Sequence, residues 1–225
     1  MREGRTAIVT GGGRGIGAAV ARALTARGVR VTAFARTAAE VERVAREGGA
    51  ALAVAGDVRR EADVRRLREE HERALGPVDV LVNGAGILLR GPAEDLGVEA
   101  FREVLDVNLV GPFLCAREVI PGMKARGRGR IVNVASISAT LGTPLASPYN
   151  ASKWGLVGLT KCLAEELRAA GVQCLAVSPG STDTAMLAQT PFPPQMTPED
   201  VARVVVFAAL DAPDAMTGAN VEVFG

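Results

Sequence analysis

A short apolar stretch that runs straight into a cluster of glycines is the feature that most constrains the fold of this chain. The stretch, residues 6–10, is rich in β-branched residues, and Gly-Gly-Gly-Arg-Gly-Ile-Gly follows it directly. The Ala-rich segment 18–27 comes next and favours a helix. A strand, a tight turn and a helix in this order bring backbone N–H groups and the positive end of a helix to one point, where a phosphate group can bind.

Three of these glycines have distinct expected roles. Gly11 allows the tight turn, and Gly15 and Gly17 let a pyrophosphate and the neighbouring strand approach without an intervening Cβ. Their spacing, G-x-x-x-G-x-G, differs from the usual dinucleotide pattern G-x-G-x-x-G. A glycine turn with a purely structural role is therefore the alternative interpretation of this segment.

Apolar runs alternate with helical stretches along the rest of the chain. Strands are expected at residues 6–10, 29–35, 50–55, 78–82, 131–135, 172–177 and 220–224, and the longer helices at about 18–27, 60–75, 98–125 and 148–169. Near-continuous Val, Ile, Ala and Leu runs are typical of parallel strands covered on both faces. The pattern predicts an α/β fold, a Rossmann-type doubly wound parallel sheet of about seven strands with helices on both faces. Because no linker divides the chain, we expect one domain spanning residues 1–225.

The charge balance excludes several classes of partner. The net charge is +1, with Lys and Arg interleaved with Asp and Glu, so we expect neither nucleic acid nor an anionic membrane as a partner. No apolar run approaches the ~18 residues of a membrane span, and no signal-peptide segment is recognised at the start. The sequence therefore predicts a cytoplasmic protein.

No disulfide, metal-binding or catalytic role is predicted for the cysteines or the histidine. Cys115, Cys162 and Cys174 are odd in number and lie in apolar surroundings, which indicates buried free thiols rather than disulfides or a metal site. The single histidine, His71, is flanked by two glutamates in the predicted helix 60–75 and is expected to be a solvated surface residue. No metal site is predicted.

Polar and glycine-rich segments follow four of the expected strands. They are residues 11–17, 83–86, 136–138 and 179–184. Ligands of parallel α/β sheets bind beyond the carboxyl ends of the strands, and these ends share one edge. We therefore expect the four segments to gather around one site.

A tyrosine and a lysine are placed to act together. Tyr149 and Lys153 lie four residues apart in the predicted helix 148–169, so both side chains share one face. Ser147 is expected as the N-cap of that helix, with Pro148 in its first turn. A phenol with a pKa near 10 needs a shift of roughly three units, or ~4 kcal/mol, to act as an acid–base group near neutral pH. A nearby ammonium and a cationic nicotinamide ring could supply that shift. The alternative is a half-buried core tyrosine beside a snorkelling lysine.

The chain resembles the short-chain dehydrogenase/reductase family, of the single-domain type, along nearly its whole length. The motifs that carry this resemblance occur in the family's order and at its spacing: Thr10-Gly11-x-x-x-Gly15-x-Gly17, Asp57, Asn83-x-Ala85-Gly86, Asn108, Ser136, Tyr149-x-x-x-Lys153, and Pro179-Gly180 with Thr184. The resemblance implies an enzyme that interconverts a carbonyl group and a secondary alcohol by hydride transfer.

The resemblance also implies a role for each catalytic candidate. Tyr149 would donate a proton to the carbonyl oxygen or remove one from the alcohol, and Lys153 would lower the pKa of Tyr149 and bind the nicotinamide ribose. Ser136 would hold the substrate oxygen, with Ser138 as its competitor. Asn108 would sit at a helix irregularity and hold a water that links Lys153 to solvent. The alternative for Asn108 is an ordinary polar helix residue bonded to the backbone.

The implied cofactor site draws on more of the chain. Asp57 would accept a hydrogen bond from the adenine amino group, or instead would only cap the following helix. Asn83 would shape the ribose side, and Thr184 with the backbone near Thr182 would meet the carboxamide. The implied cofactor-binding residues are Gly11, Arg14, Gly15, Ile16, Gly17, Arg36, Asp57, Val58, Asn83, Ala85, Gly86, Tyr149, Lys153, Pro179, Gly180, Thr182 and Thr184.

The charge after the second expected strand selects NADP(H) over NAD(H). NAD-binding proteins usually place an Asp or Glu there for the ribose 2′-hydroxyl. This chain has Ala35 followed by Arg36, and Arg14 lies in the glycine turn. Two guanidinium groups without a carboxylate suit a 2′-phosphate. Because arginine is abundant in this chain, an accidental pair is the alternative.

The substrate is the least constrained part of the prediction. Several apolar residues could line a pocket near the nicotinamide, although core packing explains some of them equally well: Leu88, Leu89, Leu141, Met186, Leu187, Phe192 and Met196. The region 101–186 resembles bacterial 3-oxoacyl-[acyl-carrier-protein] reductases, so a 3-oxoacyl group linked to an acyl carrier protein is the leading candidate. The alternatives are a reductase of other ketones or aldehydes and a catalytically idle NADP-binding regulator. The resemblance also implies a homo-oligomer, a tetramer or a dimer.

Overall fold

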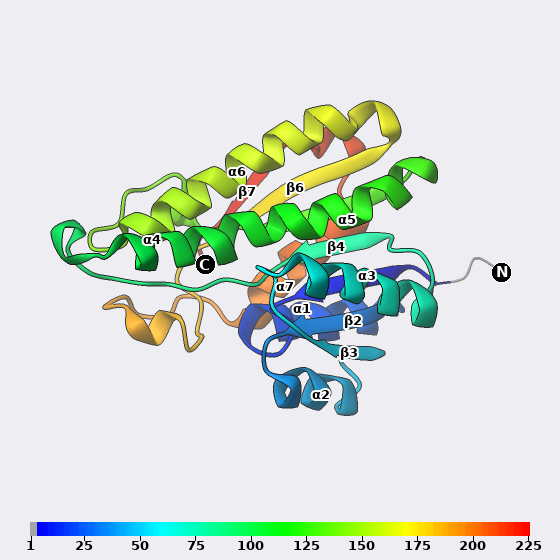
Figure 1. The fold of residues 1–225 in the computed structure, drawn as a ribbon, viewed down its shortest axis with the longest axis horizontal. Coiled ribbons are helices and arrows are strands. Elements are labelled where there is room, and N and C mark those ends of the chain that lie inside the picture. Colours follow the sequence, from blue (N-terminus) through cyan, green and yellow to red (C-terminus); the bar gives the residue numbers. More distant parts are fainter. Residues whose placement is uncertain (1–3) are drawn as a thin grey trace.

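Seven parallel strands form one sheet at the centre of the computed structural model, which describes residues 4–225 (Figure 1). Their spatial order is β3-β2-β1-β4-β5-β6-β7, and every neighbouring pair is parallel. The strands are β1 (Thr6–Thr10), β2 (Arg30–Ala35), β3 (Leu52–Ala55), β4 (Val80–Asn83), β5 (Gly129–Val134), β6 (Val172–Pro179) and β7 (Asn220–Val223). The predicted fold class is confirmed. The first three residues of the predicted domain 1–225 lie outside the described part.

Helices cover both faces of the sheet, because each strand connects to the next through a helical crossover (Figure 1). The α-helices are α1 (Gly15–Ala26), α2 (Ala38–Arg46), α3 (Glu61–Leu75), α4 (Val98–Leu105), α5 (Gly111–Ala125), α6 (Ser147–Leu167) and α7 (Pro198–Val206). The short 3-10 turns are η1 (Ala93–Asp95), η3 (Ile137–Ala139), η4 (Arg168–Ala170), η5 (Leu187–Gln189) and η7 (Asp214–Met216). Two π turns, η2 (Asp106–Val110) and η6 (Phe207–Asp211), complete the helical elements.

The alternation of side chains along the strands divides the core into two layers. In β1, Ala7 and Val9 face the layer that contains α1, α2 and α7, whereas Ile8 faces the layer that contains α3, α5 and α6. All three side chains are almost completely buried. This period of two, with both faces apolar, explains why the strands are near-continuous apolar runs in the sequence.

The strand order reverses direction at β1. The chain moves outward from β1 to β2 and β3, then returns to place β4 on the other side of β1. At such a switch point the connections after β1 and β4 diverge to opposite faces and leave a crevice at the carboxyl ends of the strands. In Figure 1 the segment after β6, drawn in orange, and the loop after β4 both extend at the left of the molecule.

The predicted continuous helix 98–125 is divided in the structure by a π turn. Helix α4 ends at Leu105, η2 spans Asp106–Val110, and α5 begins at Gly111. Gly111 N–H donates to the Asp106 carbonyl, which is the i→i−5 bond of a π turn. Pro112 comes next and has no N–H to donate to the preceding turn. The Gly-Pro pair inside the predicted helix was the available sequence signal.

His71 was predicted to be solvated, and that prediction is wrong. Its side chain is fully buried under α3, with Nδ1 2.8 Å from Thr32 Oγ1 and Nε2 3.1 Å from Thr6 Oγ1. The Thr6 hydroxyl donates its proton to the Pro77 carbonyl, so Nε2 of His71 is the donor and Nδ1 accepts from Thr32. The helical spacing of Leu67, His71 and Leu75 places the ring on the buried face. The flanking glutamates lie on neighbouring faces.

The cysteines agree with the prediction at two of three positions. Cys115 and Cys174 are buried free thiols, and burial raises the pKa of each to about 12. Cys162 is also free but is exposed on the outer side of α6, so its predicted burial is wrong. No group of His, Cys, Asp and Glu side chains within residues 4–225 is arranged to hold a metal ion. In the same range, no helix combines the length and apolar character needed to cross a membrane.

The buried imidazole predicts a pH-dependent contribution to stability. Burial lowers the pKa of His71 from 6.5 to about 4, so the unfolded chain binds a proton between these values that the folded chain does not. The free energy of unfolding therefore falls as the pH drops from about 6.5 towards 4, by up to about 3 kcal/mol from this group. Urea unfolding of the wild type and of His71→Gln, which lacks any histidine, isolates the effect. The stability advantage of the wild type should shrink over that interval, and a constant difference would contradict the assignment.

Candidate active site

The glycine turn after β1 is closed by contacts that leave no space for side chains. A Cβ on Gly17 would lie 2.1 Å from the Gly11 carbonyl oxygen, and a Cβ on Gly11 would lie 2.7 Å from the carbonyl oxygen of Gly84, after β4. Gly11 and Gly15 have φ values of +68° and +52°, which favour glycine. Backbone conformation and close packing thus favour glycine at these positions, and the approach of a pyrophosphate to Gly15 and Gly17 stays a prediction.

Helix α1 begins at this turn with free backbone donors. Its N-cap, Arg14, makes no side-chain capping hydrogen bond, and the first N–H groups of any α-helix have no partner within the helix. Ile16, in the first turn, lines a cavity of about 490 Å³ that extends to the catalytic candidates. The start of α1 therefore has the donors and the positive dipole that bind a pyrophosphate.

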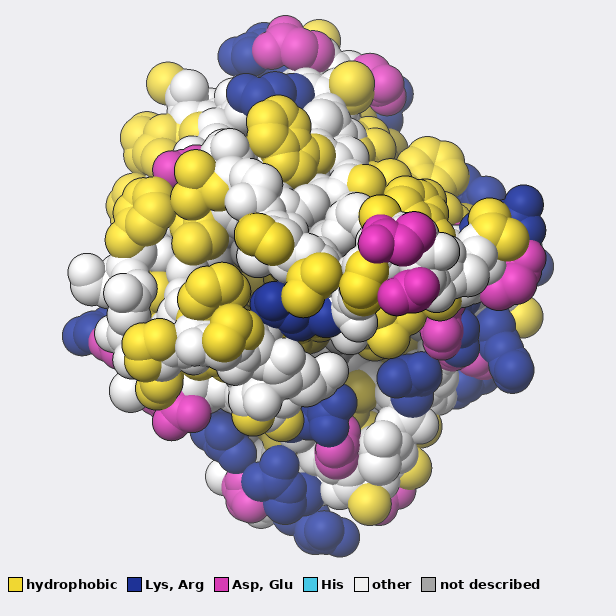
Figure 2. Space-filling model, turned by 90° about the vertical axis from the view of Figure 1, so that its left-hand side faces the viewer, with side chains coloured by type: hydrophobic (Ala, Val, Ile, Leu, Met, Phe, Trp, Pro, Cys, Tyr) yellow, Lys and Arg dark blue, Asp and Glu magenta, His cyan; other side chains and the backbone are white. Residues whose placement is uncertain are grey.

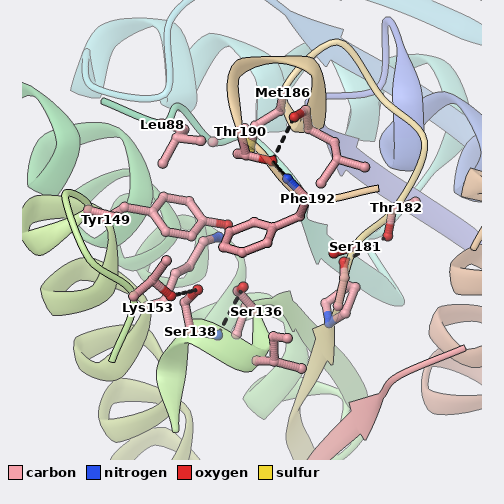
Figure 3. Close-up of a pocket in the computed structure, with 18 of the residues that line it drawn as sticks. Leu88, Ser136, Ser138, Tyr149, Lys153, Ser181, Thr182, Met186, Thr190 and Phe192 are labelled. Atoms are coloured by element: carbon pink, nitrogen blue, oxygen red, sulfur yellow. Dashed lines mark hydrogen bonds between the residues drawn. The ribbon is translucent and has the colours of Figure 1, made fainter. Parts of the chain in front are cut away.

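Tyr149 and Lys153 lie one helical turn apart on α6 and face the same cavity (Figure 3). The Lys153 nitrogen lies 5.7 Å from the centre of the Tyr149 ring and donates to the Val134 carbonyl at 2.8 Å. Pro148 is in the first turn as predicted, but the N-cap is Ala146, and Ser147 begins the helix without a capping bond. The helix thus places both side chains at the carboxyl end of β5.

Ser136 is the serine that belongs with this pair. It follows β5 directly, is 8% exposed, and its Oγ accepts a hydrogen bond from Ser138 N–H at 3.1 Å. The Ser138 hydroxyl instead pairs with Thr143 Oγ1 at 3.3 Å. Ser136 is also near enough to Tyr149 to oppose the effect of burial on the pKa of its phenol. This proximity supports Ser136 rather than Ser138 as the partner of Tyr149.

Burial is the largest influence on the pKa values of Tyr149 and Lys153. It raises the pKa of the Tyr149 phenol above its ordinary value of 10, and a hydrogen bond with Ser136 opposes this by lowering it. Burial also lowers the pKa of Lys153 from 10.5 to about 8. The amine thus remains mostly protonated at pH 7, close to a phenol that is difficult to ionise.

Asn108 lies in the π turn, at the helix irregularity that the resemblance implied. Its side chain is fully buried, with Oδ1 accepting from Ile87 N–H at 2.9 Å and Nδ2 donating to the Ile87 carbonyl at 2.9 Å. Nδ2 also lies 3.0 Å from Oγ of Ser152, which donates to the Tyr149 carbonyl at 2.6 Å. Asn108 therefore joins the loop after β4 to helix α6.

Ser152 is a residue of this site that the sequence interpretation missed. It is fully buried between Asn108 and the backbone of Tyr149. The available signal was its position between Tyr149 and Lys153, three residues after the tyrosine and so on the same side of the helix.

The cavity also brings together most of the residues predicted for the nicotinamide end and the apolar pocket. Its lining includes Ile16, Gly86, Leu88, Ser136, Leu141, Tyr149, Lys153, Pro179, Gly180, Thr182, Thr184, Met186, Leu187 and Phe192. Leu89 does not line it. Met196 is buried in the core layer with α7, so core packing explains this residue. Arg90, Thr143 and Thr190 line the cavity and were not predicted.

Asn83 does not reach the cavity and belongs to a buried polar ladder. Its Nδ2 donates to Asn133 Oδ1 at 2.9 Å, and Asn133 Nδ2 donates to Thr160 Oγ1 at 2.9 Å. The ladder joins β4, β5 and α6 beneath the site. Asn83 thus ties the end of β4 to β5 within the core, while Thr10 Oγ1 accepts from the N–H of Ala85 and Gly86 lines the cavity.

Asp57 follows β3 and is held by an ion pair. Arg59 donates to its carboxylate through Nη2 at 2.6 Å and Nε at 3.0 Å, and this hydrogen bonding lowers the pKa of Asp57. Asp57 also accepts from the Arg59 N–H, but α3 begins two residues later with Arg60 as N-cap and no side-chain cap. The alternative role as a helix cap is therefore not what the structure shows. The neighbouring Val58 is buried against α5.

Comparisons with known proteins agree with this arrangement. Residues 5–192 match the family model described as short chain dehydrogenase. A cis-4-hydroxycyclohexanecarboxylate dehydrogenase from Sinomonas cyclohexanicum is 38% identical, over 98% of this chain and 95% of its own. A 2-dehydro-3-deoxy-L-rhamnonate dehydrogenase (NAD(+)) from a Sphingomonas species is 41% identical, over 84% and 76%. The crystal structure of a 3-ketoacyl-(acyl-carrier-protein) reductase from Brucella melitensis, complexed with NADH, superimposes with a TM-score of 0.94 at 35% identity, over 99% and 98%.

The buried amine of Lys153 should be visible by NMR. The chain has three lysines, Lys124, Lys153 and Lys161, so a protein labelled with ¹³C-lysine gives three resolvable Cε signals. We expect one of them to titrate with a pKa of about 8 and to vanish in Lys153→Met. The two signals that remain in the variant identify the Lys153 signal by difference. A Lys153 signal that titrates at the reference lysine value of about 10.4 would show that burial does not perturb this amine.

Proposed function

The chain belongs to the short-chain dehydrogenase/reductase family of oxidoreductases, and from this premise we propose that it is an NADPH-dependent enzyme that interconverts a carbonyl group and a secondary alcohol, with Tyr149 as the general acid and base. The observation that carries the proposal is the convergence of Ser136, Tyr149 and Lys153 in one cavity that begins at the start of α1.

Each of these side chains has a task in carbonyl reduction. The Ser136 hydroxyl donates a hydrogen bond to the carbonyl oxygen, which accumulates negative charge as it is reduced. Tyr149 gives its phenolic proton to the same oxygen, and in the opposite direction the phenolate removes a proton from the alcohol. When bound, the reduced nicotinamide supplies the hydride for the carbonyl carbon.

Lys153 and Asn108 support the phenol rather than react. To work near neutral pH, the pKa of Tyr149 must fall by roughly three units, about 4 kcal/mol, against the effect of burial. The charged amine of Lys153 and the positive charge of an oxidised nicotinamide would both stabilise the phenolate. The Lys153 amine is also placed to bind the ribose, and Asn108 and Ser152 fix the helix that carries the pair.

The choice of NADPH rests on charge at the adenine end of the proposed site. Ala35 ends β2 without a carboxylate, and the Arg36 that follows is close enough to contribute to the lowered pKa of Asp57. Arg14, in the glycine turn, has a side chain 70% exposed, and its guanidinium is 3.8 Å from Glu40 of α2. Glu40 partly offsets Arg14, so Arg36 is the stronger candidate to bind a 2′-phosphate.

The cavity suits a ketone with an apolar body. Leu88, Leu141, Met186 and Phe192 are apolar parts of its lining, and hydrophobic side chains are numerous at the left and the upper right of the face shown in Figure 2. The names of similar proteins include a hydroxycyclohexanecarboxylate and a 3-ketoacyl-(acyl-carrier-protein) among the compounds they use. We therefore propose a cyclic or open-chain ketone as substrate. Among substrates attached to a carrier, the 3-oxoacyl thioester of an acyl carrier protein is the leading candidate.

Exposed aromatic residues support the proposed homo-oligomer. Phe113 on α5 and Trp154 on α6 are 43% and 55% exposed, on two helices that cover the same face of the sheet. Exposed apolar side chains that gather on one face mark interaction surfaces. A dimer or tetramer that packs these helices against a second copy would cover them.

Replacing the phenol tests the proposed reaction. In the wild type, NADPH oxidation is expected with at least one member of a panel of ketones and acetoacetyl thioesters. Tyr149→Phe removes the proton donor and should lower kcat by at least about 100-fold, while NADPH fluorescence on binding stays unchanged. Equal turnover by the variant would refute the role of Tyr149.

The same assay separates the enzyme from the idle regulator. A regulator would bind NADPH in both proteins and oxidise it in neither, whatever ketone is added. Ser152→Ala is a useful companion, because it removes a positioning contact without touching the phenol oxygen, and its kcat should fall less than that of Tyr149→Phe.

Reversing one charge tests the cofactor choice. Arg36→Asp removes a partner of the 2′-phosphate and supplies an acceptor for the 2′-hydroxyl, so kcat/KM should fall for NADPH and rise for NADH. A combined change in preference of roughly 100-fold is expected for a charge-assisted contact. Steady-state kinetics with both nucleotides measures it, with Arg46→Asp, at the last residue of α2 and outside the proposed site, as the control. An unchanged preference would contradict the charge argument.

A further inference from the structure

A second cation lines the cavity besides the catalytic amine. Among the residues that line it, Lys153 and Arg90 are the charged ones. Arg90 lies in the loop between β4 and η1, four residues after Gly86. The proposed hydride-transfer chemistry uses Lys153 and leaves Arg90 without a task.

The structure holds the Arg90 guanidinium in place from two sides. Its Cζ lies 5.8 Å from the centre of the Phe192 ring, and Nη2 donates to the Pro144 carbonyl at 3.4 Å. The loop itself is tied down next to the side chain, where Gly91 N–H donates to the Leu145 carbonyl at 2.8 Å. Stacking on an aromatic ring and a backbone anchor restrict an otherwise flexible side chain.

Arg90 forms no ion pair with any carboxylate in the part of the chain that the structure describes. Glu94 and Asp95 follow it closely in η1, yet neither pairs with it. Most arginines on the helices have such a partner, as Arg102 has in Glu99. A guanidinium has five N–H donors in a planar fork, and the bond to Pro144 uses one of them.

The remaining donors of this half-buried side chain border a cavity with a largely apolar lining, and a hydrogen bond from a guanidinium to a carboxylate is charge-assisted. Leu88, Leu141 and Phe192 line the same space. A planar carboxylate matches the fork and would neutralise the unpaired charge.

We propose that Arg90 binds a carboxylate that the substrate carries away from its reacting carbonyl. The substrate is then an oxo acid, or the corresponding hydroxy acid, whose skeleton between the two groups is apolar. This inference rests on the proposed function for the position of the carbonyl, beside Ser136 and Tyr149. Arg90 makes the enzyme selective for acids and takes no part in hydride or proton transfer.

The first experiment measures binding and needs no turnover. Cyclohexanecarboxylate and cyclohexanecarboxamide have the same skeleton and differ in charge, and calorimetry on the protein with saturating NADP⁺ gives both affinities. The wild type should bind the acid more tightly than the amide. Arg90→Met should weaken binding of the acid by roughly 10- to 100-fold and binding of the amide by less than about twofold. For the acid, the affinity of Arg90→Lys should lie between those of the wild type and Arg90→Met.

Two controls separate a charge contact from a merely structural one. Arg128→Met also removes one positive charge, from an exposed side chain before β5, at the amino ends of the strands, and should leave both affinities unchanged. If Arg90 only braces Phe192 and Pro144, Arg90→Met weakens acid and amide alike, which overturns the proposal. Equal affinity of the wild type for acid and amide also overturns it.

The second experiment measures turnover of 4-oxocyclohexanecarboxylate, its methyl ester and acetoacetyl-coenzyme A. We expect Arg90→Met to raise KM for the acid alone and to leave kcat and the values for the ester unchanged. If Arg90→Met lowers turnover of acetoacetyl-coenzyme A alone, Arg90 contacts the phosphates of a thioester carrier, and the proposed carboxylate contact is overturned. Turnover of ketones without preference for the acid would refute this proposal and leave the oxidoreductase intact. If binding of the acid depends on Arg90 but no ketone is turned over, the carboxylate site stands and the proposed oxidoreductase activity is refuted.

Discussion

The arrangement of the site depends on how closely three pieces of backbone approach one another at the end of β1. The Gly11 carbonyl, the start of α1 at Gly17 and the Gly84 segment after β4 are so near that an added Cβ would come within 2.1 to 2.7 Å of main-chain atoms. This approach places a helix N-terminus directly beside the crevice at the switch point of the sheet. The donors for a phosphate and the end of β4 therefore belong to one rigid corner, against which the groups on α6 are positioned.

A second set of interactions connects that corner to helix α6 through buried polar side chains. The ladder from Asn83 through Asn133 to Thr160 crosses β4, β5 and α6, and the bonds of Asn108 and Ser152 tie the π turn to the backbone of Tyr149. Buried amides and hydroxyls cost stability unless their partners are present, so such networks specify one relative placement of the elements they join. The π turn has a clear role here, since it carries the Asn108 amide to the centre of the network.

The sequence was sufficient for the fold and for the centre of the site, for different reasons. The strands are buried on both faces, so their apolar runs were easy to recognise, and the four-residue spacing of Tyr149 and Lys153 fixed their common face once the helix was assigned. The structure differs from the prediction where a neighbouring residue masks the local pattern or where tertiary packing decides the outcome. The burial of His71 follows from its helical spacing with Leu67, which the two neighbouring glutamates concealed, whereas the exposure of Cys162 depends on which side of α6 meets the sheet. The position of Arg90 over Phe192 could not be foreseen, because it depends on two loops without regular structure that meet only in the folded chain.

The burial of the one imidazole has a consequence for kinetics. An enzyme with several histidines gives pH–rate profiles whose breaks near neutrality have several candidate origins. Here the ring of His71 is locked among threonine hydroxyls in the core and stays neutral until well into the acid range, and the two buried thiols ionise only in strongly basic solution. A break between pH 7 and 9 in the rate of this protein would then report on few groups, with the neighbouring phenol of Tyr149 and amine of Lys153 foremost among them. The profile then measures how a bound nucleotide alters that pair.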